Sequence, residues 1–287
     1  MTAPLLRRPV MRYLGGKWRI APWIVSHFPA HRVYLEPFGG AASVLLRKPR
    51  PEVGGGECYN DLDHSVVNLF QVLRDPDQAE ELARRIGLTP FAREEYDLAF
   101  KFARCPIERA RRLIVRSYMG HGSSSAVASR QTGFRASMIN RKGALPANEW
   151  PGLPSALLAV RDRLQGVLIE HRPALALIDR YDTPETLAYL DPPYMPATRS
   201  AKRRGGQAFH AYAHEMTEVD HAQLLHRARA FSGMVAISGY ASDLYEDLLG
   251  DWARHEFDTH ADGALKRTEV LWLNPAAANA VRMGARS

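Results

Sequence analysis

The sequence predicts an α/β fold, a doubly wound parallel sheet interrupted by a mostly helical insert. Two strand-turn-helix units follow one another near the N-terminus, in HRVYLEPFGGAASVLL and in ECYNDLDHSVVNLFQVLRD. Such alternation is typical of a parallel sheet with helices packed on its faces. The pattern stops near residue 76 and resumes near residue 161. We therefore expect one sheet domain made of residues 1–75 and 161–287, with residues 76–160 as an inserted subdomain.

The period of the apolar residues locates the elements of the first half. Apolar residues every three or four positions predict a helix, whereas a short continuous apolar run predicts a buried strand. The expected elements, in order, are a helix over 17–28, a strand over 33–35, a tight glycine turn, a helix from 41 to 47, a strand ending at 59, and a helix that Asp61 or Asp63 can cap.

Helical periodicity continues into the insert, over Gln78–Ile86, Arg93–Ala103 and Glu108–Tyr118. A loop-rich stretch follows, and it contains no acid between His121 and Asn148. Its basic side chains are therefore candidates for binding an anion.

Sheet-forming segments return after the insert. The strand candidates are GVLIEH, TLAYLDPPY, MVAISGY and RTEVLWLN, which begin at residues 166, 186, 234 and 267. A helix is expected over Thr217–Phe231, because Thr217 and Asp220 have the spacing of a capping box.

The composition restricts the class of protein. Lysine and arginine exceed the acids by 38 to 31, a net charge of +7, so an anionic partner is possible, although plain soluble enzymes are also often basic. Two cysteines are too few for a disulfide framework or a four-cysteine zinc site. No long apolar run is present. We expect a cytoplasmic protein with no export signal and no membrane span, a monomer or weak homodimer.

Two unusual loops, EPFGG and DPPY, fall at the carboxyl ends of expected strands, where open parallel sheets bind ligands. Neither glycine motif of dinucleotide or triphosphate sites is present. Glu36 is suited to a cationic group, and Asp61 is placed to bind ribose hydroxyls. A cofactor with both features is S-adenosylmethionine. The alternative is that Glu36 and Asp61 are helix caps.

The DPPY turn suggests the reaction. Prolines stiffen it, and they position the Asp191 carboxylate, the Pro192 carbonyl and the Tyr194 ring. Two acceptors beside an aromatic face match the amino group of a flat heterocycle. Holding both hydrogens returns the lone pair to nitrogen, so that the amine can attack a sulfonium methyl with no metal.

A base inside a duplex is out of reach, so it has to be flipped into the pocket. Basic side chains near the turn and in the acid-free loop are natural contacts to phosphates and bases, although each also fits a solvated surface. The candidates for contacting double-stranded DNA are Arg130, Gln131, Arg135, Arg141, Lys142, Lys202, Arg203 and Arg204. Through DNA binding, we expect the protein to associate with the nucleoid.

The order of RYLGGK, YLEPFGG, YND, DPPY and ISGY resembles that of the Dam-like family of DNA adenine-N6 methyltransferases, the permuted alpha group. The resemblance runs from about Arg12 to Asn274 and implies a Rossmann-like methyltransferase sheet, with the insert recognising the target. It implies that Pro193 belongs to the catalytic turn with Asp191, Pro192 and Tyr194, and that Tyr212 contacts DNA. The cofactor contacts that it implies are Tyr13, Gly15, Gly16, Lys17, Glu36, Pro37, Phe38, Gly39, Gly40, Asp61, Leu62 and Asp191.

The chain departs from the family at two points. The family often has F-x-G-x-G, but Ala42 replaces the second glycine, which implies an altered turn or a tighter pocket. The insert also lacks the hairpin rich in asparagine and phenylalanine of members that methylate GATC, so the recognition sequence stays open.

Other interpretations of the motifs remain open. The acceptor could be RNA adenine, cytosine N4 or a protein glutamine, although the last two usually accompany Ser or Asn at the position of Asp191. A catalytically silent nucleic-acid-binding protein is a further alternative. His210 and His214 do not form a zinc motif, and Ser238 is not in a nucleophile elbow, so we expect Ser238 to be structural.

Overall fold

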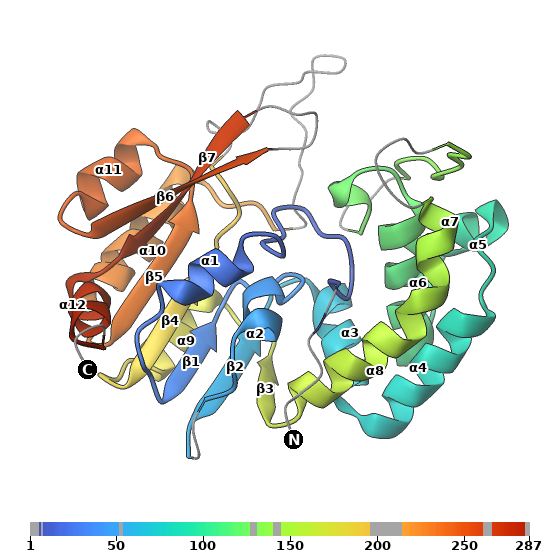
Figure 1. Ribbon diagram of the computed structural model, residues 1–287, viewed down its shortest axis with the longest axis horizontal. Helices are drawn as coiled ribbons and strands as arrows, with labels where there is room; N and C mark the ends of the chain where they lie inside the picture. Colours follow the sequence, from blue (N-terminus) through green and yellow to red (C-terminus); the bar gives the residue numbers. More distant parts are fainter. Residues whose placement is uncertain are drawn as a thin grey trace.

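The computed structural model describes residues 6, 8–51, 54–126, 131–139, 145–195, 214–260 and 266–284. Within these residues the chain forms a seven-stranded sheet with helices on both faces (Figure 1). The strands are β1 (Val33–Glu36), β2 (Gly56–Asn60), β3 (Val167–Glu170), β4 (Thr186–Leu190), β5 (Met234–Gly239), β6 (Ala253–His260) and β7 (Lys266–Leu273). The predicted α/β class is confirmed.

The strand order is β3-β2-β1-β4-β5-β7-β6. The strands β1 to β5 pair in parallel, and β7 runs antiparallel to both of its neighbours. The order reverses between β1 and β4, and a crevice at the carboxyl ends is expected at such a switch point. Both EPFGG and DPPY follow strands at this point, because β1 ends at Glu36 and β4 ends at Leu190.

Alternating side chains on each strand build two cores. Leu35 belongs to a cluster with the helices α9 (Ala174–Arg180), α10 (Glu218–Ala230) and α11 (Asp243–Leu249). Tyr34 points to the other face and belongs to a cluster with α1 (Ala21–Ser26), α2 (Ser43–Arg47), α3 (His64–Arg74) and α12 (Pro275–Gly284). The strand alternation thus fixes which helices cover which face.

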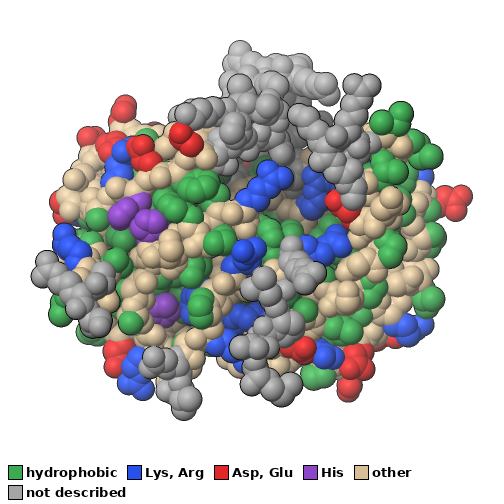
Figure 2. Space-filling model, in the orientation of Figure 1, with side chains coloured by type: hydrophobic (Ala, Val, Ile, Leu, Met, Phe, Trp, Pro, Cys, Tyr) green, Lys and Arg blue, Asp and Glu red, His purple; other side chains and the backbone are tan. Residues whose placement is uncertain are grey.

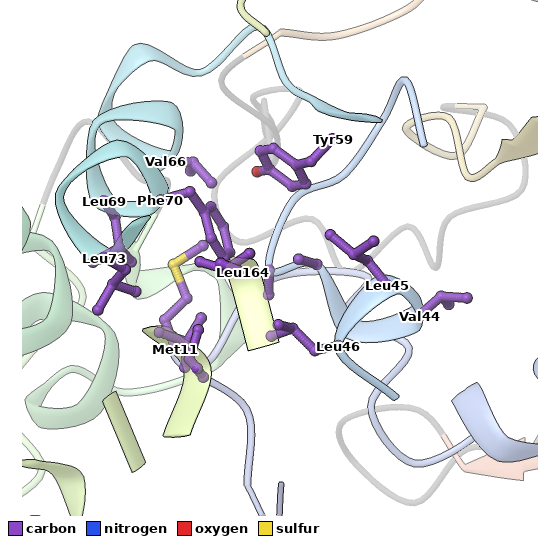
Figure 3. Close-up of a cluster of buried hydrophobic side chains, with 14 of the residues drawn as sticks. Met11, Val44, Leu45, Leu46, Tyr59, Val66, Leu69, Phe70, Leu73 and Leu164 are labelled. Atoms are coloured by element: carbon purple, nitrogen blue, oxygen red, sulfur yellow. The ribbon is translucent and has the colours of Figure 1, made fainter. Parts of the chain in front are cut away.

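The insert forms a helical layer beside the sheet (Figure 1). Its helices are α4 (Pro76–Leu88), α5 (Arg93–Leu98), α6 (Pro106–Met119), η1 (Ser123–Ala126), α7 (Pro146–Glu149), η2 (Trp150–Gly152) and α8 (Leu153–Leu164). The expected boundary at residue 160 falls within α8. Figure 3 shows Met11 and Leu164 beside Phe70 of α3 and Leu46 of α2, so the core is continuous from the sheet into the insert.

Two predicted helices are longer than the observed ones. The helix expected over 17–28 is limited to α1, which has Pro22 in its first turn, a residue that favours a helix start. The helix expected over 93–103 ends at Leu98. Beyond it, Arg116 and Arg112 of α6 donate to the carbonyls of residues 99, 101 and 102, so the segment is held by side chains of another helix.

No helix among the described residues combines the length and the apolar character needed to cross a membrane.

Candidate active site

A cavity of about 330 Å³ opens at the carboxyl ends of β1, β2 and β4. Every residue to which the family resemblance assigns a cofactor contact lines it: Tyr13, Gly15, Gly16, Lys17, Glu36, Pro37, Phe38, Gly39, Gly40, Asp61, Leu62 and Asp191. Pro192 and Pro193 line the same cavity. The structure therefore brings the loops together, while the role of each residue stays a prediction.

The glycine pair shapes one wall of the cavity. Gly40 has a φ of +47°, which favours glycine. A Cβ on Gly39 would lie 2.1 Å from Cε2 of Tyr59, and the hydroxyl of Tyr59 donates to the carbonyl of Gly40 at 2.7 Å. The ring of Tyr59 therefore leaves no room for a side chain at position 39.

Glu36 is almost fully buried at the end of β1. Its Oε2 accepts hydrogen bonds from the Tyr34 hydroxyl at 2.7 Å and from the Leu45 amide at 3.0 Å. Leu45 is the third residue of α2, so Glu36 does cap this helix, as the alternative interpretation proposed. Among the described residues, the other oxygen of Glu36 has no hydrogen-bond partner. Burial, with a smaller contribution from the charge of Asp191, raises the pKa of Glu36 to about 8.

The cap by Glu36 accompanies an unusual start of α2. Its N-cap, Ala42, has no side-chain cap and a left-handed backbone, with φ of 52° and ψ of 34°. This is the position at which the family pattern has glycine. The chain therefore keeps the glycine conformation with an alanine, at a cost of about 1–2 kcal/mol in backbone strain.

Asp61 is held rigidly and does not cap a helix. Its Oδ2 accepts the Gly40 amide at 2.8 Å, and its Oδ1 accepts the Asp63 amide at 2.8 Å. The N-cap of α3 is Asp63, which accepts from the Ser65 amide. Burial raises the pKa of Asp61, and its two backbone hydrogen bonds oppose this shift. Each carboxylate oxygen retains a lone pair for a further donor.

Asp191 follows β4 and forms an ion pair with Lys17, whose Nζ lies 2.7 Å from Asp191 Oδ1. The hydroxyl of Ser238 on β5 donates to the same oxygen at 2.9 Å, and it also contacts the hydroxyl of Tyr189 at 2.7 Å. Burial raises the pKa of Asp191, while Lys17 and Ser238 oppose the shift. Among the described residues, the second oxygen of Asp191 has no hydrogen-bond partner.

Tyr194 is not among the described residues that line the cavity, but it lies next to Lys17. Its hydroxyl accepts a hydrogen bond from Lys17 Nζ at 2.5 Å and donates to Glu269 Oε1 on β7 at 2.9 Å. Its ring lies 4.4 Å, centre to centre, from that of Tyr240. If a base stacks on Tyr194 as predicted, it has to contact the ring while Lys17, Glu269 and Tyr240 remain in contact with the same side chain.

The cavity is bordered by more acids than bases. Glu36, Asp61 and Asp191 line the cavity, whereas Lys17 is the single lysine or arginine among its described lining residues. Lys17 is buried and lies next to Asp191 and Glu269. Burial lowers the pKa of Lys17, but Asp191 and Glu269 outweigh this and raise it well above its ordinary value. The excess of carboxylates favours a cationic ligand.

Sequence reasoning missed Glu269 and the contact of Ser238 with Asp191. The only signal for either was a polar residue inside an apolar strand run. It also missed two wall segments, which are 173–175 after β3 and 214–216 before α10.

Two candidate DNA contacts are described, and both make contacts within the insert. Gln131 donates to Asp97, and Arg135 donates to the Tyr118 carbonyl at 3.1 Å. The others, Arg130, Arg141, Lys142, Lys202, Arg203, Arg204 and Tyr212, lie outside the described residues.

Comparison with known families assigns the first part of the chain. Residues 13–119 match the model of the D12 class N6 adenine-specific DNA methyltransferases. No curated protein matches the sequence. The match contains the glycine loop, Glu36 and Asp61, and it ends before the DPPY turn. The reaction of this family is methylation of adenine N6 in DNA, with a methyl donor of the S-adenosylmethionine type. The match over residues 13–119 agrees with the family resemblance of the motifs and supports the enzyme class that they predicted, an adenine-specific DNA methyltransferase.

Proposed function

We propose that this enzyme is a site-specific DNA methyltransferase that uses S-adenosylmethionine to methylate an adenine flipped out of double-stranded DNA, with S-adenosylhomocysteine as the second product. The observation that carries the proposal is that Asp191 and its two prolines line the same cavity as Glu36 and Asp61. A methyl donor and an acceptor amine held there would meet at Asp191.

The chemistry of the cavity fits this cofactor. Its carboxylates suit the ammonium and sulfonium charges, and Asp61 offers free lone pairs to ribose hydroxyls. Phe38, Leu62 and Leu175 supply apolar wall for a flat adenine ring. When bound, the cofactor supplies the electrophilic methyl group.

The residues of this chain then act on the acceptor. Asp191 and the Pro192 carbonyl accept the two hydrogens of the amine, and this directs the nitrogen lone pair toward the methyl group. As the nitrogen–carbon bond forms, the bond between the methyl carbon and the sulfur of the donor would break, with its electron pair left on sulfur, and nitrogen loses a proton. Asp191 is the acceptor for this proton, because burial already raises its pKa. Tyr194 supplies the aromatic face for the base.

We assign DNA binding to the surface where the insert adjoins the sheet. Figure 2 shows Lys and Arg side chains gathered there, and Arg8 and Arg12 both lie near Tyr118 at the end of α6. A positive surface beside the cavity suits phosphates. We therefore propose residues 76–160 as the target-recognition subdomain and residues 1–75 and 161–287 as the catalytic domain.

The test is Asp191→Ala, with Asp251→Ala as its control, because Asp251 is an exposed acid that pairs with Arg229. One portion of the DNA from expressing cells is digested to nucleosides, and the methylated nucleoside is identified by mass spectrometry. A second, undigested portion is analysed by long-read sequencing, which gives the sequence context of the modification. We expect N6-methyladenine with the wild type and the control, and none with Asp191→Ala. Asp191→Ser, which keeps a polar group beside Lys17, is measured if the alanine variant unfolds. Full methylation by a folded Asp191 variant would refute the proposal.

A further inference from the structure

Glu269 is a buried acid that no motif assigns to the reaction. It lies on β7, is 2% exposed, and precedes the apolar run Val270–Leu273. Both of its oxygens are close to the Tyr194 hydroxyl, at 2.9 and 3.2 Å. Its Oε1 also lies 3.4 Å from Lys17 Nζ. Glu269 therefore contacts two residues of the candidate site at once.

Lys17 connects the same groups from the other side. Its ammonium lies 2.7 Å from Asp191, 2.5 Å from the Tyr194 hydroxyl and 3.0 Å from the Gly15 carbonyl. The network thus joins the N-terminal loop, the DPPY turn and β7, which are far apart in the sequence. A shift of Glu269 would release both the Tyr194 hydroxyl and one side of the ammonium.

Stability alone does not explain the net negative charge of the network formed by Lys17, Asp191 and Glu269. Lys17 and Asp191 already neutralise each other, so Glu269 adds a second carboxylate to a buried pair. Burying an extra charge is unfavourable unless it is paired and hydrogen-bonded. Apolar residues follow Glu269 on the strand, and an apolar side chain in its place would avoid this cost. The two contacts to site residues give the acid a reason to be there.

We propose that Glu269 is a positioning residue of the methyl transfer, which anchors the hydroxyl of Tyr194 so that its ring is fixed for the target base and holds Lys17 against Asp191. This inference rests on the proposed function. The hydroxyl bond fixes the rotation of the Tyr194 side chain, and a stacking residue fixed in advance loses less entropy when the base arrives. The contact with Lys17 keeps the ammonium beside the carboxylate that receives the amine.

The test compares Glu269→Gln with Glu256→Gln. Glutamine keeps the shape and an acceptor but removes the charge, and Glu256 is an exposed acid on the neighbouring β6 that pairs with Arg254. We expect Glu269→Gln to lower kcat by roughly 10- to 100-fold, the loss expected for a charged hydrogen bond, with little change in the Kd of S-adenosylhomocysteine. The control should retain the kcat of the wild type.

Two further measurements separate positioning from a structural role. Asp191, Glu269, Tyr189 and Tyr194 face Lys17, and the charge of Glu269 raises the pKa of Lys17. The alkaline limb of the pH–kcat profile should therefore move to lower pH in Glu269→Gln. In a Tyr194→Phe background, which has no hydroxyl to anchor, the loss caused by Glu269→Gln should shrink by at least threefold.

The duplex substrate carries the sequence identified by long-read sequencing, with 2-aminopurine as the target base for a fluorescence measurement of stacking. Glu269→Asp should partly restore kcat and is also the variant measured if glutamine unfolds the protein. A folded Glu269→Gln with the kcat and the pH profile of the wild type would overturn the inference, as would equal losses in the Tyr194 and Tyr194→Phe backgrounds. Absence of transfer by the wild type would instead refute the proposed function.

Discussion

The buried carboxylate of Glu36 predicts that cofactor affinity depends on pH. The perturbation is Glu36→Gln, in which an amide oxygen can still accept from the Tyr34 hydroxyl and the Leu45 amide. Burial raises the pKa of Glu36 to about 8, the hydroxyl and the amide oppose the shift, and the charges of Asp191 and Glu57 add to it. In the ligand-free protein, Glu36 is therefore mostly protonated at pH 7, whereas a cationic ligand requires the carboxylate.

The magnitude follows from the fraction of carboxylate. With a pKa of about 8, roughly 9% of Glu36 is ionised at pH 7 and about 91% at pH 9. If the ligand binds the ionised form, the association constant of the wild type should rise about tenfold over this range relative to that of Glu36→Gln. Binding at pH 7 should also release close to one proton.

The assay is titration calorimetry of S-adenosylmethionine at several pH values, in buffers with different ionisation enthalpies. The amino group of the ligand titrates in the same range, but this effect is common to both proteins and cancels from the ratio of their constants. A ratio that stays flat between pH 7 and 9, with no difference in proton release, would refute the reasoning.

In the absence of ligand, the raised pKa of Glu36 makes the folded protein less stable as the pH rises. The folded-state pKa of Glu36 lies above the value of 4.5 for the free group, so the unfolded chain is ionised first as pH rises. Relative to Glu36→Gln, the wild type should lose at most about 1.4 kcal/mol of unfolding free energy per pH unit between roughly pH 4.5 and 8. Urea unfolding at pH 5 and pH 8 measures this, and equal differences at both pH values would contradict it.

Three further predictions concern stability, each measured by urea unfolding. Gly39→Ala should lose about 1–3 kcal/mol and weaken cofactor binding, because its Cβ would overlap the ring of Tyr59; an unchanged midpoint would show that the ring moves aside. Ala42→Gly should gain up to about 1 kcal/mol, because relief of left-handed strain exceeds the entropy that glycine adds to the unfolded chain; a loss would mean that the strain is small. Glu57→Gln should lose about 3–5 kcal/mol, because it leaves the buried Arg163 without its carboxylate, and a loss below 1 kcal/mol would contradict the burial argument.

The sheet could be predicted because its signals are local. Each parallel strand is a short apolar run followed by a turn and a helix, so the alternation alone determines the class. The end of α5 could not be predicted in this way, because carbonyls beyond Leu98 are bound by Arg112 and Arg116 of α6. No pattern within residues 93–103 contains that information.

The candidate site also has some residues that local sequence patterns predict and others that they do not. The glycine loop, Asp61 and the DPPY turn can be recognised in the sequence by their residue types and by their position after a strand. The helix-capping contact of Glu36 could not be predicted in this way, because its contact with Leu45 depends on how α2 returns to the sheet. The helix cap and the proposed ligand site do not exclude each other, because the cap uses one oxygen of Glu36 and leaves the other for the proposed ligand.

The position of Glu269 in β7 shows which part of its environment the strand pattern predicts. Side chains alternate along β7, so Glu269 shares a face with Leu271 and Leu273, both fully buried. An acid on a buried face needs a partner, and this alone predicts a cation or a donor beside it. Its partners cannot be read from the sequence, because they follow from the antiparallel insertion of β7 beside β5, which places Glu269 next to the strand end that carries Tyr240. Strand order, which is a property of the whole chain, therefore converts a lone polar residue into a member of the site.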